Sequence, residues 1–237
     1  MAGNTSMTFC LSSYFWVALV VFLLKAVLGI NGLAIDLGFV LISLLVMLLC
    51  FSSIMSERCG TAPLGAVLGA VLPPWILMVG ALVTLIFVFP GWIQPFSNTF
   101  GYLVCFVPGI NSREKLTAIL NPKNKTMSKL IVEDPMLMLN QFSSARFGEI
   151  MERMEREGVV TSKNGEALKD FAKIVHIKDS VAELLWHLLV GCVAITTAYN
   201  NMMNTVCQKD FIKTVAVSPA SALTGSVTDL ADKLQAS

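Results

Sequence analysis

The sequence predicts an all-α, polytopic membrane protein with about four transmembrane helices and an amphipathic helical extramembrane segment. The first observation is charge: the first 110 residues contain only four charged side chains, Lys25, Asp36, Glu57 and Arg58. Soluble domains carry roughly a quarter charged residues, so lipid is the expected solvent for this half of the chain. The second observation is a series of apolar runs long enough to span a bilayer, with a mean hydropathy of +0.70.

The first two spans are expected to form a helical hairpin within residues 9–55. A helix needs about 20 apolar residues to cross a hydrocarbon core about 30 Å thick, and residues 9–30 and 33–55 both meet that length. A turn-forming stretch with two glycines separates them. Lys25 and Asp36 flank this turn and could form an ion pair across it, and Lys25 could also extend its ammonium group to the lipid headgroups.

The third span falls within residues 64–89 and contains two helix-disrupting residues, Pro73 and Pro74. Proline lacks a backbone N–H donor and clashes with the preceding turn, so we expect the helix to kink or restart there. Gly65 and Gly69 lie four residues apart, a spacing that lets another helix backbone approach closely in lipid.

Residues 92–109 complete a membrane domain that covers residues 1–110. This stretch is rich in aromatic residues, proline, asparagine and glycine, and its apolar core is too short to span a bilayer. We therefore expect an interfacial or re-entrant segment whose irregular backbone is shielded by protein.

A charged helical extramembrane segment is predicted at residues 111–180. Residues 113–180 alone hold twelve basic and ten acidic side chains. Asp134 and Pro135 are typical of a helix start, because Asp can cap free N–H groups and Pro suits the first helical position. Apolar residues at helical spacing then predict one amphipathic helix that ends near Gly158.

The last helix is predicted to begin in water near residue 164 and to enter the bilayer as a final transmembrane helix at residues 181–199. A polar tail follows at residues 200–237. The positive-inside rule places residues 111–180 on the cytosolic side of the membrane and both termini on the opposite side.

Four ionisable residues within or beside the spans are candidate functional groups, because charge in a bilayer is costly: Lys25, Asp36, Glu183 and His187. Glu183 and His187 share one helix face, which fits a polar contact near the interface, a proton or ion pathway, or a metal site. A metal requires more ligands, and the second histidine of the chain, His176, lies about three turns upstream. We therefore predict no metal site.

Several classes of function have no support in the sequence. It contains no nucleophile, phosphate-binding, zinc-protease or dinucleotide-binding motif, so we expect neither an enzyme nor a bound cofactor. A formal net charge of +1 offers no basic surface for nucleic acid. The six cysteines are scattered, mostly in apolar runs, and we expect no disulfide framework from them.

The most distinctive stretch covers residues 90–102 and combines a helix stop, aromatic interface residues and a helix-capping pair. Its characteristic residues are Pro90, Gly91, Trp92, Pro95, Phe96, Asn98, Thr99, Gly101 and Tyr102. The stretch resembles a motif in small membrane proteins of nucleocytoplasmic large DNA viruses, the group that includes chlorella viruses, marseilleviruses and iridoviruses. The resemblance implies a minor capsid protein in the internal virion membrane, which derives from the host endoplasmic reticulum.

The resulting hypothesis is a structural virion protein that links this membrane to major or minor capsid proteins through residues 111–180. Two alternatives belong to other classes. A small transporter or channel would use Glu183, His187, Lys25 or the Pro73–Pro74 break as elements of a pathway. An accessory subunit of a cellular membrane complex would share the helical layout and the lack of catalytic motifs.

Overall fold

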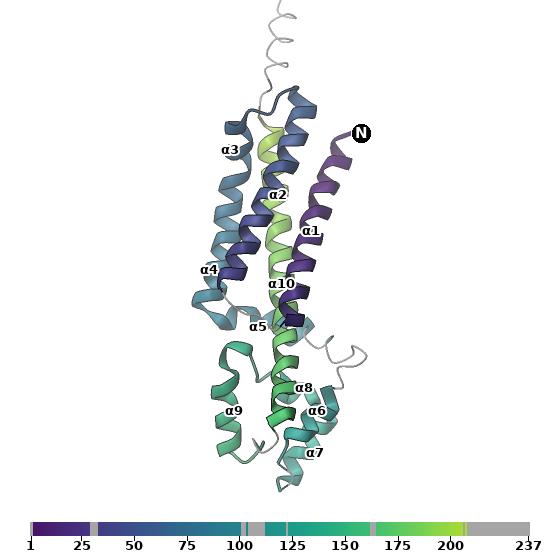
Figure 1. The fold of residues 1–237 in the computed structure, drawn as a ribbon, viewed down its shortest axis with the longest axis vertical. Helices are drawn as coiled ribbons and strands as arrows, with labels where there is room; N and C mark the ends of the chain where they lie inside the picture. Colours follow the sequence, from purple (N-terminus) through teal and green to yellow (C-terminus); the bar gives the residue numbers. More distant parts are fainter. Residues whose placement is uncertain are drawn as a thin grey trace, which may run out of the picture.

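The computed structural model describes residues 2–28, 33–100, 103, 112–121, 123–161, 165–205 and 207. These residues form a bundle of long helices and a smaller helical cap (residues 112–161) that packs around the lower part of one long helix (Figure 1). Four of the described helices are long and apolar enough to cross a membrane. The predicted all-α, polytopic fold is therefore confirmed.

Helices α1 (Ala2–Leu28) and α2 (Leu33–Cys59) form the predicted hairpin. The turn between them lies outside the described residues. The hairpin exposes large apolar side chains, as expected for helices in lipid. These side chains are Phe9, Phe15, Trp16, Val20, Leu23, Leu24, Val27 and Leu28 on α1, and Leu37, Leu41, Ile42, Leu45 and Leu49 on α2.

The third span consists of α3 (Leu64–Pro74), the π-helical segment η1 (Trp75–Gly80) and α4 (Ala81–Val88). The helix continues through both prolines without a restart, but the α pattern ends at Pro74 and a π-helical segment begins at Trp75, so the predicted disturbance lies at the prolines. It continues because the backbone N–H of Trp75 still finds acceptors in the preceding turn, the carbonyl oxygens of Leu72 and Val71. The prolines instead precede a change to the wider π hydrogen-bond pattern, which is frequent where an α-helix is locally disturbed.

The chain leaves the bundle through η2 (Pro90–Ile93), a 3₁₀ turn, and α5 (Gln94–Phe100). Helix α5 runs crosswise below the bundle and packs against the long helix (Figure 1). The predicted interfacial segment thus begins as a short helix lying across the ends of the spans. Residues 101, 102 and 104–111, which include Gly101 and Tyr102 of the motif, lie outside the described residues.

The cap contains α6 (Ser112–Ile119), α7 (Lys125–Glu133), α8 (Pro135–Leu139), the 3₁₀ turn η4 (Ser144–Arg146) and α9 (Phe147–Arg156). It has a hydrophobic core of its own, to which the long helix contributes. Buried members of this core are Leu116, Ile119, Leu120, Ile131, Met138, Leu139, Phe142, Met151, Val160, Phe171, Ile174 and Val175.

The single amphipathic helix predicted from Asp134 to Gly158 is wrong in its middle. Helix α8 ends at Leu139, and α9 begins at Phe147 after a non-helical connection. The predicted end near Gly158 is confirmed, because Gly158 has a φ of 71° that favours glycine and stops α9.

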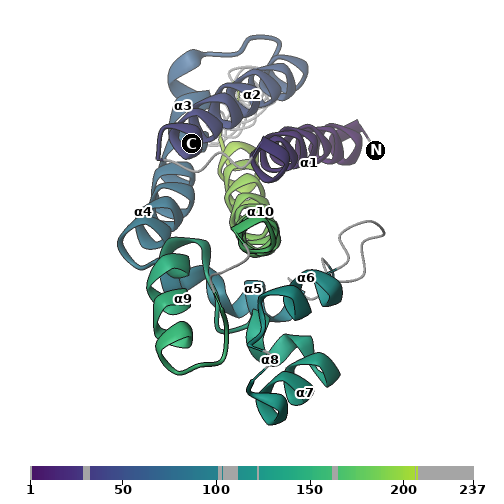
Figure 2. The ribbon, with the colours of Figure 1, turned by 60° about the horizontal axis from the view of Figure 1, so that its bottom comes forward.

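The long helix α10 (Gly165–Met203) has 39 residues and passes through both parts of the protein. Figure 2 shows the cap helices and α5 grouped around its lower end. In the bundle α10 packs tightly against α1: a Cβ atom added at Gly191 would lie 2.2 Å from Cζ of Tyr14. Gly65 and Gly69 are exposed, and a Cβ atom added at either would meet nothing within 4 Å, so no described residue makes the predicted close approach to them.

Two disulfides lie at the end of the bundle away from the cap, one between α1 and α2 and one between the end of α2 and Cys207, which follows α10. Cys10 is bonded to Cys50, and Cys59 to Cys207. The expectation of no disulfide framework is therefore wrong. The Cys59–Cys207 pair leaves no signal in the spacing along the chain, because helix packing brings together two cysteines that are 148 residues apart.

Candidate functional site at the junction of bundle and cap

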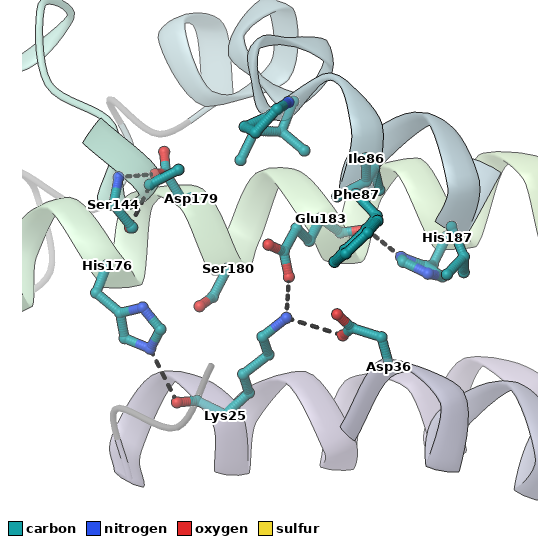
Figure 3. Close-up of a pocket in the computed structure, with 14 residues that line it drawn as sticks. Lys25, Asp36, Ile86, Phe87, Ser144, His176, Asp179, Ser180, Glu183 and His187 are labelled. Atoms are coloured by element: carbon teal, nitrogen blue, oxygen red, sulfur yellow. Dashed lines mark hydrogen bonds and ion pairs between the residues drawn. The ribbon is translucent and has the colours of Figure 1, made fainter. Parts of the chain in front are cut away.

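A buried ion cluster joins the hairpin to α10 where the bundle meets the cap (Figure 3). The Lys25 ammonium lies 2.9 Å from a carboxylate oxygen of Asp36 and also forms an ion pair with Glu183. The predicted pairing of Lys25 with Asp36 is confirmed. Lys25 is only 3% exposed, so its predicted extension to the headgroups is wrong: two carboxylates inside the protein compensate its charge.

His187 lies one turn above this cluster and is enclosed by aromatic rings. Its ring centroid is 4.9 Å from that of Phe22 and 5.1 Å from that of Phe39. Its Nδ1 is 2.8 Å from the Glu183 carbonyl oxygen. A carbonyl oxygen only accepts, so this geometry assigns the hydrogen to Nδ1. The two side chains thus share a helix face, as predicted, but their contact is through the backbone.

The geometry does not favour a metal at this position. Among the described residues, no group of three or more His, Cys, Asp or Glu side chains is arranged to hold a metal ion. His176 uses Nε2 to contact the Lys25 carbonyl oxygen at 3.1 Å.

Asp179 forms a second buried connection, between α10, α5 and the cap. One carboxylate oxygen accepts a hydrogen bond from the Ser97 hydroxyl at 2.7 Å. The other accepts from the backbone N–H and the hydroxyl of Ser144, at 2.6 and 2.8 Å. A single buried carboxylate therefore holds three chain segments together through charge-assisted hydrogen bonds.

Lys178, the neighbour of Asp179, is 1% exposed and forms a third connection. Its ammonium donates to the carbonyl oxygens of Leu139 and Phe142, at 3.1 and 2.9 Å, and lies 3.5 Å from Oδ1 of Asn98. These carbonyl groups lie where α8 ends, so Lys178 stabilises the interruption that the sequence did not predict.

The distinctive motif of residues 90–102 lies against these connections. Trp92 and Phe96 pack on Trp186 of α10, with ring centroids 5.8 and 4.4 Å apart. Pro90 and Gly91 form the turn that directs the chain across the bundle. The remaining described members lie on α5: Pro95, Asn98 and Thr99, whose hydroxyl donates to the Pro95 carbonyl oxygen at 2.7 Å.

A cavity of about 370 Å³ adjoins the ion cluster. Its wall includes Lys25, Glu183, Ser180 and His187. Ser180 Oγ and His187 Nε2 are buried and have no hydrogen-bond partner among the described residues. Buried polar groups of this kind usually bind water or a polar ligand.

Sequence reasoning missed Ser97, Lys178 and Asp179, although one of them left a signal. Lys178 continues the stripe of buried apolar residues on α10 at helical spacing, after Phe171 and Val175. A charged side chain in a buried stripe indicates an internal partner. Ser97 and Asp179 carry no comparable pattern.

A scan against protein-family models, a search of curated proteins and a search of solved structures each found no match to this chain.

Proposed function

We propose that this protein is a structural membrane protein, whose bundle holds the cap at the bilayer surface for binding to other proteins. The observation that carries the proposal is the join between the two parts. Helix α10 runs through both hydrophobic cores without interruption, and buried polar contacts fix its junction to α1, α5 and the cap. A rigid connection of this kind suits a protein that holds its cap at a fixed position relative to the bundle, rather than one that turns over a substrate.

The free energy needed to open these contacts supports a rigid connection. Each buried connection made by Lys25, Lys178 and Asp179 would leave charged or polar groups unpaired if it opened. Opening one costs about 1–3 kcal/mol for unpaired polar groups, and about 3–5 kcal/mol where an ion loses its partner. A hinge at this position would break several of them together.

The orientation we propose places the cap in the cytosol. Both disulfides lie at the opposite end of the bundle, and disulfides form and persist in oxidising compartments such as the lumen of the endoplasmic reticulum. The positive-inside rule gives the same orientation from the basic residues of the cap.

The setting we propose is the internal membrane of a large DNA virus, with capsid proteins as partners of the cap. The resemblance of residues 90–102 to a motif of such proteins supports it. The position of this motif adds a physical reason, because Trp92, Phe96 and Ser97 connect the bundle to α10 where the cap begins. The proposal assigns the chain no reaction, cofactor or nucleic acid.

Amine-reactive cross-linking of intact, gradient-purified virions, read by mass spectrometry, tests this proposal. Lys123, Lys129 and Lys169 are exposed on the cap and on the adjoining turn of α10, so we expect cross-links from them to capsid protein. Lys129→Arg is the matched control, because it removes one reactive amine and keeps the charge. Absence of the chain from purified virions would refute the viral setting, and recovery in a host membrane complex would favour an accessory subunit.

A small transporter or channel is the second candidate, favoured by the cavity beside Glu183. Its unpartnered Ser180 and His187 atoms could line a path for protons or ions. Flux through reconstituted protein that is abolished by Glu183→Gln would support this candidate over the structural role. The matched control is Glu149→Gln, because Glu149 is exposed on the cap and paired only at the surface.

A further inference from the structure

A second cavity, of about 920 Å³, lies where the third span ends. Its wall comes from the end of α4, the η2 turn, the start of α5, Trp186 of α10 and the cap residues Ser143 and Arg146. It is separate from the ion cluster, whose residues do not line it. Since α4, the last part of the third span, ends here and α5 turns across the bundle, we expect the cavity to open near the depth where acyl chains meet headgroups.

Most of the wall is apolar and continues the lipid-facing surface of the bundle. Val88, Phe89 and Trp92 line the cavity, and they are 54%, 60% and 42% exposed. Phe96 and Trp186 close it on the side of α10. A bilayer acyl chain could therefore enter from the surrounding lipid without crossing water.

Two of the residues that line this cavity, Arg146 and Trp186, carry hydrogen-bond donors that suit an anionic group. Trp186 Nε1 is buried and has no partner among the described residues. Arg146 reaches the cavity from the cap and donates to Glu149 through Nε and Nη2, which leaves Nη1 for another acceptor. Arg146 is the one charged residue among the described residues that line this cavity.

We propose that this cavity binds one phospholipid with an anionic headgroup. An acyl chain lies on the wall of Val88, Phe89 and Phe96, and the phosphate accepts hydrogen bonds from Arg146 and Trp186. Apolar walls with a few convergent polar groups are typical of ligand sites, and arginine is well suited to phosphate. The proposal is independent of the partner that the cap binds.

Native mass spectrometry of the detergent-purified full chain, titrated with phosphatidylglycerol and with phosphatidylcholine, tests this site. Gly91 lines the cavity and a Cβ there meets nothing within 4 Å, so a side chain can start at this position, and Gly91→Phe is chosen to fill the cavity. Gly148, on α9, is equally open and is not among the residues that line the cavity, which makes Gly148→Phe the matched control.

We expect wild type and Gly148→Phe to retain one phosphatidylglycerol and Gly91→Phe to lose it, with unchanged helicity in all three by circular dichroism. Arg146→Gln should weaken phosphatidylglycerol binding by about tenfold, the loss expected for one charge-assisted hydrogen bond. Absence of bound lipid in wild type, or retention by Gly91→Phe, would overturn the site. Unchanged binding by Arg146→Gln, or equal binding of phosphatidylcholine, would overturn the anionic headgroup.

Discussion

Replacing Lys25 with methionine tests the buried ion cluster, because it removes the cation that pairs with Asp36 and Glu183. The side chains of Lys25, Asp36 and Glu183 are 2%, 22% and 14% exposed. Loss of one partner from a buried ion pair costs about 3–5 kcal/mol, since the remaining charge is left uncompensated. Asp36 keeps some exposure, so we expect a loss near the lower limit, about 3 kcal/mol.

Reversible unfolding in mixed micelles, followed by tryptophan fluorescence, measures this loss. Lys129→Met is the matched control, because Lys129 is 80% exposed and lies 3.9 Å from Glu133. It should change the free energy of unfolding by at most about 0.5 kcal/mol.

A neutral triple variant separates charge from packing. Lys25→Met combined with Asp36→Asn and Glu183→Gln leaves no buried charge in the cluster and should recover most of the stability lost by Lys25→Met alone. A loss of stability in Lys25→Met no larger than that in Lys129→Met, or a triple variant no more stable than Lys25→Met alone, would refute the stabilising role of the buried ion cluster.

Three further predictions concern packing, the junction and the disulfides. Gly191→Ala should lower the free energy of unfolding by about 1–3 kcal/mol, because the new methyl group overlaps the Tyr14 ring. Gly69→Ala, the control, should not reduce stability. Equal effects of the two substitutions on unfolding in micelles would contradict the observed α1–α10 packing. Asp179→Ala should lower the free energy of unfolding by about 1–3 kcal/mol, because it leaves the Ser144 N–H unpaired. It should also speed hydrogen exchange in the cap, and unchanged exchange would rule out this connection. Reducing both disulfides should lower stability by about 2–4 kcal/mol each, and a thermal midpoint insensitive to reductant would argue against them.

The hairpin could be predicted from the sequence, together with the ion pair between Lys25 and Asp36 that joins its two helices. Lys25 and Asp36 lie at nearly equal distances along the chain from the turn, so antiparallel packing brings them together. Cys10 and Cys50 have the same symmetry about the turn, and this signal could have revealed their disulfide. The second partner of Lys25, Glu183, could not be predicted, because it comes from a helix whose rotation is set by packing.

The internal structure of the cap could not be predicted from local pattern. Apolar spacing across residues 135–158 favours one helix, but Lys178 from a distant part of the chain binds the carbonyl groups where α8 ends. A long-range contact therefore overrides a local preference. The same limit applies to the glycines. Gly191 and Gly65 both lie within helices, but of these two only Gly191 lies against a side chain of another helix, Tyr14 of α1.

Hydrogen–deuterium exchange of the full chain in lipid nanodiscs tests the rigid join most directly. The relevant amides are those of α10 from Lys178 to His187, between the cap core and the bundle core. Local opening sets exchange rates, so the structure predicts that these amides exchange as slowly as those around Ala194 within the bundle. Exchange as fast as that of the exposed face of α9 would show a hinge at the junction and would contradict the account.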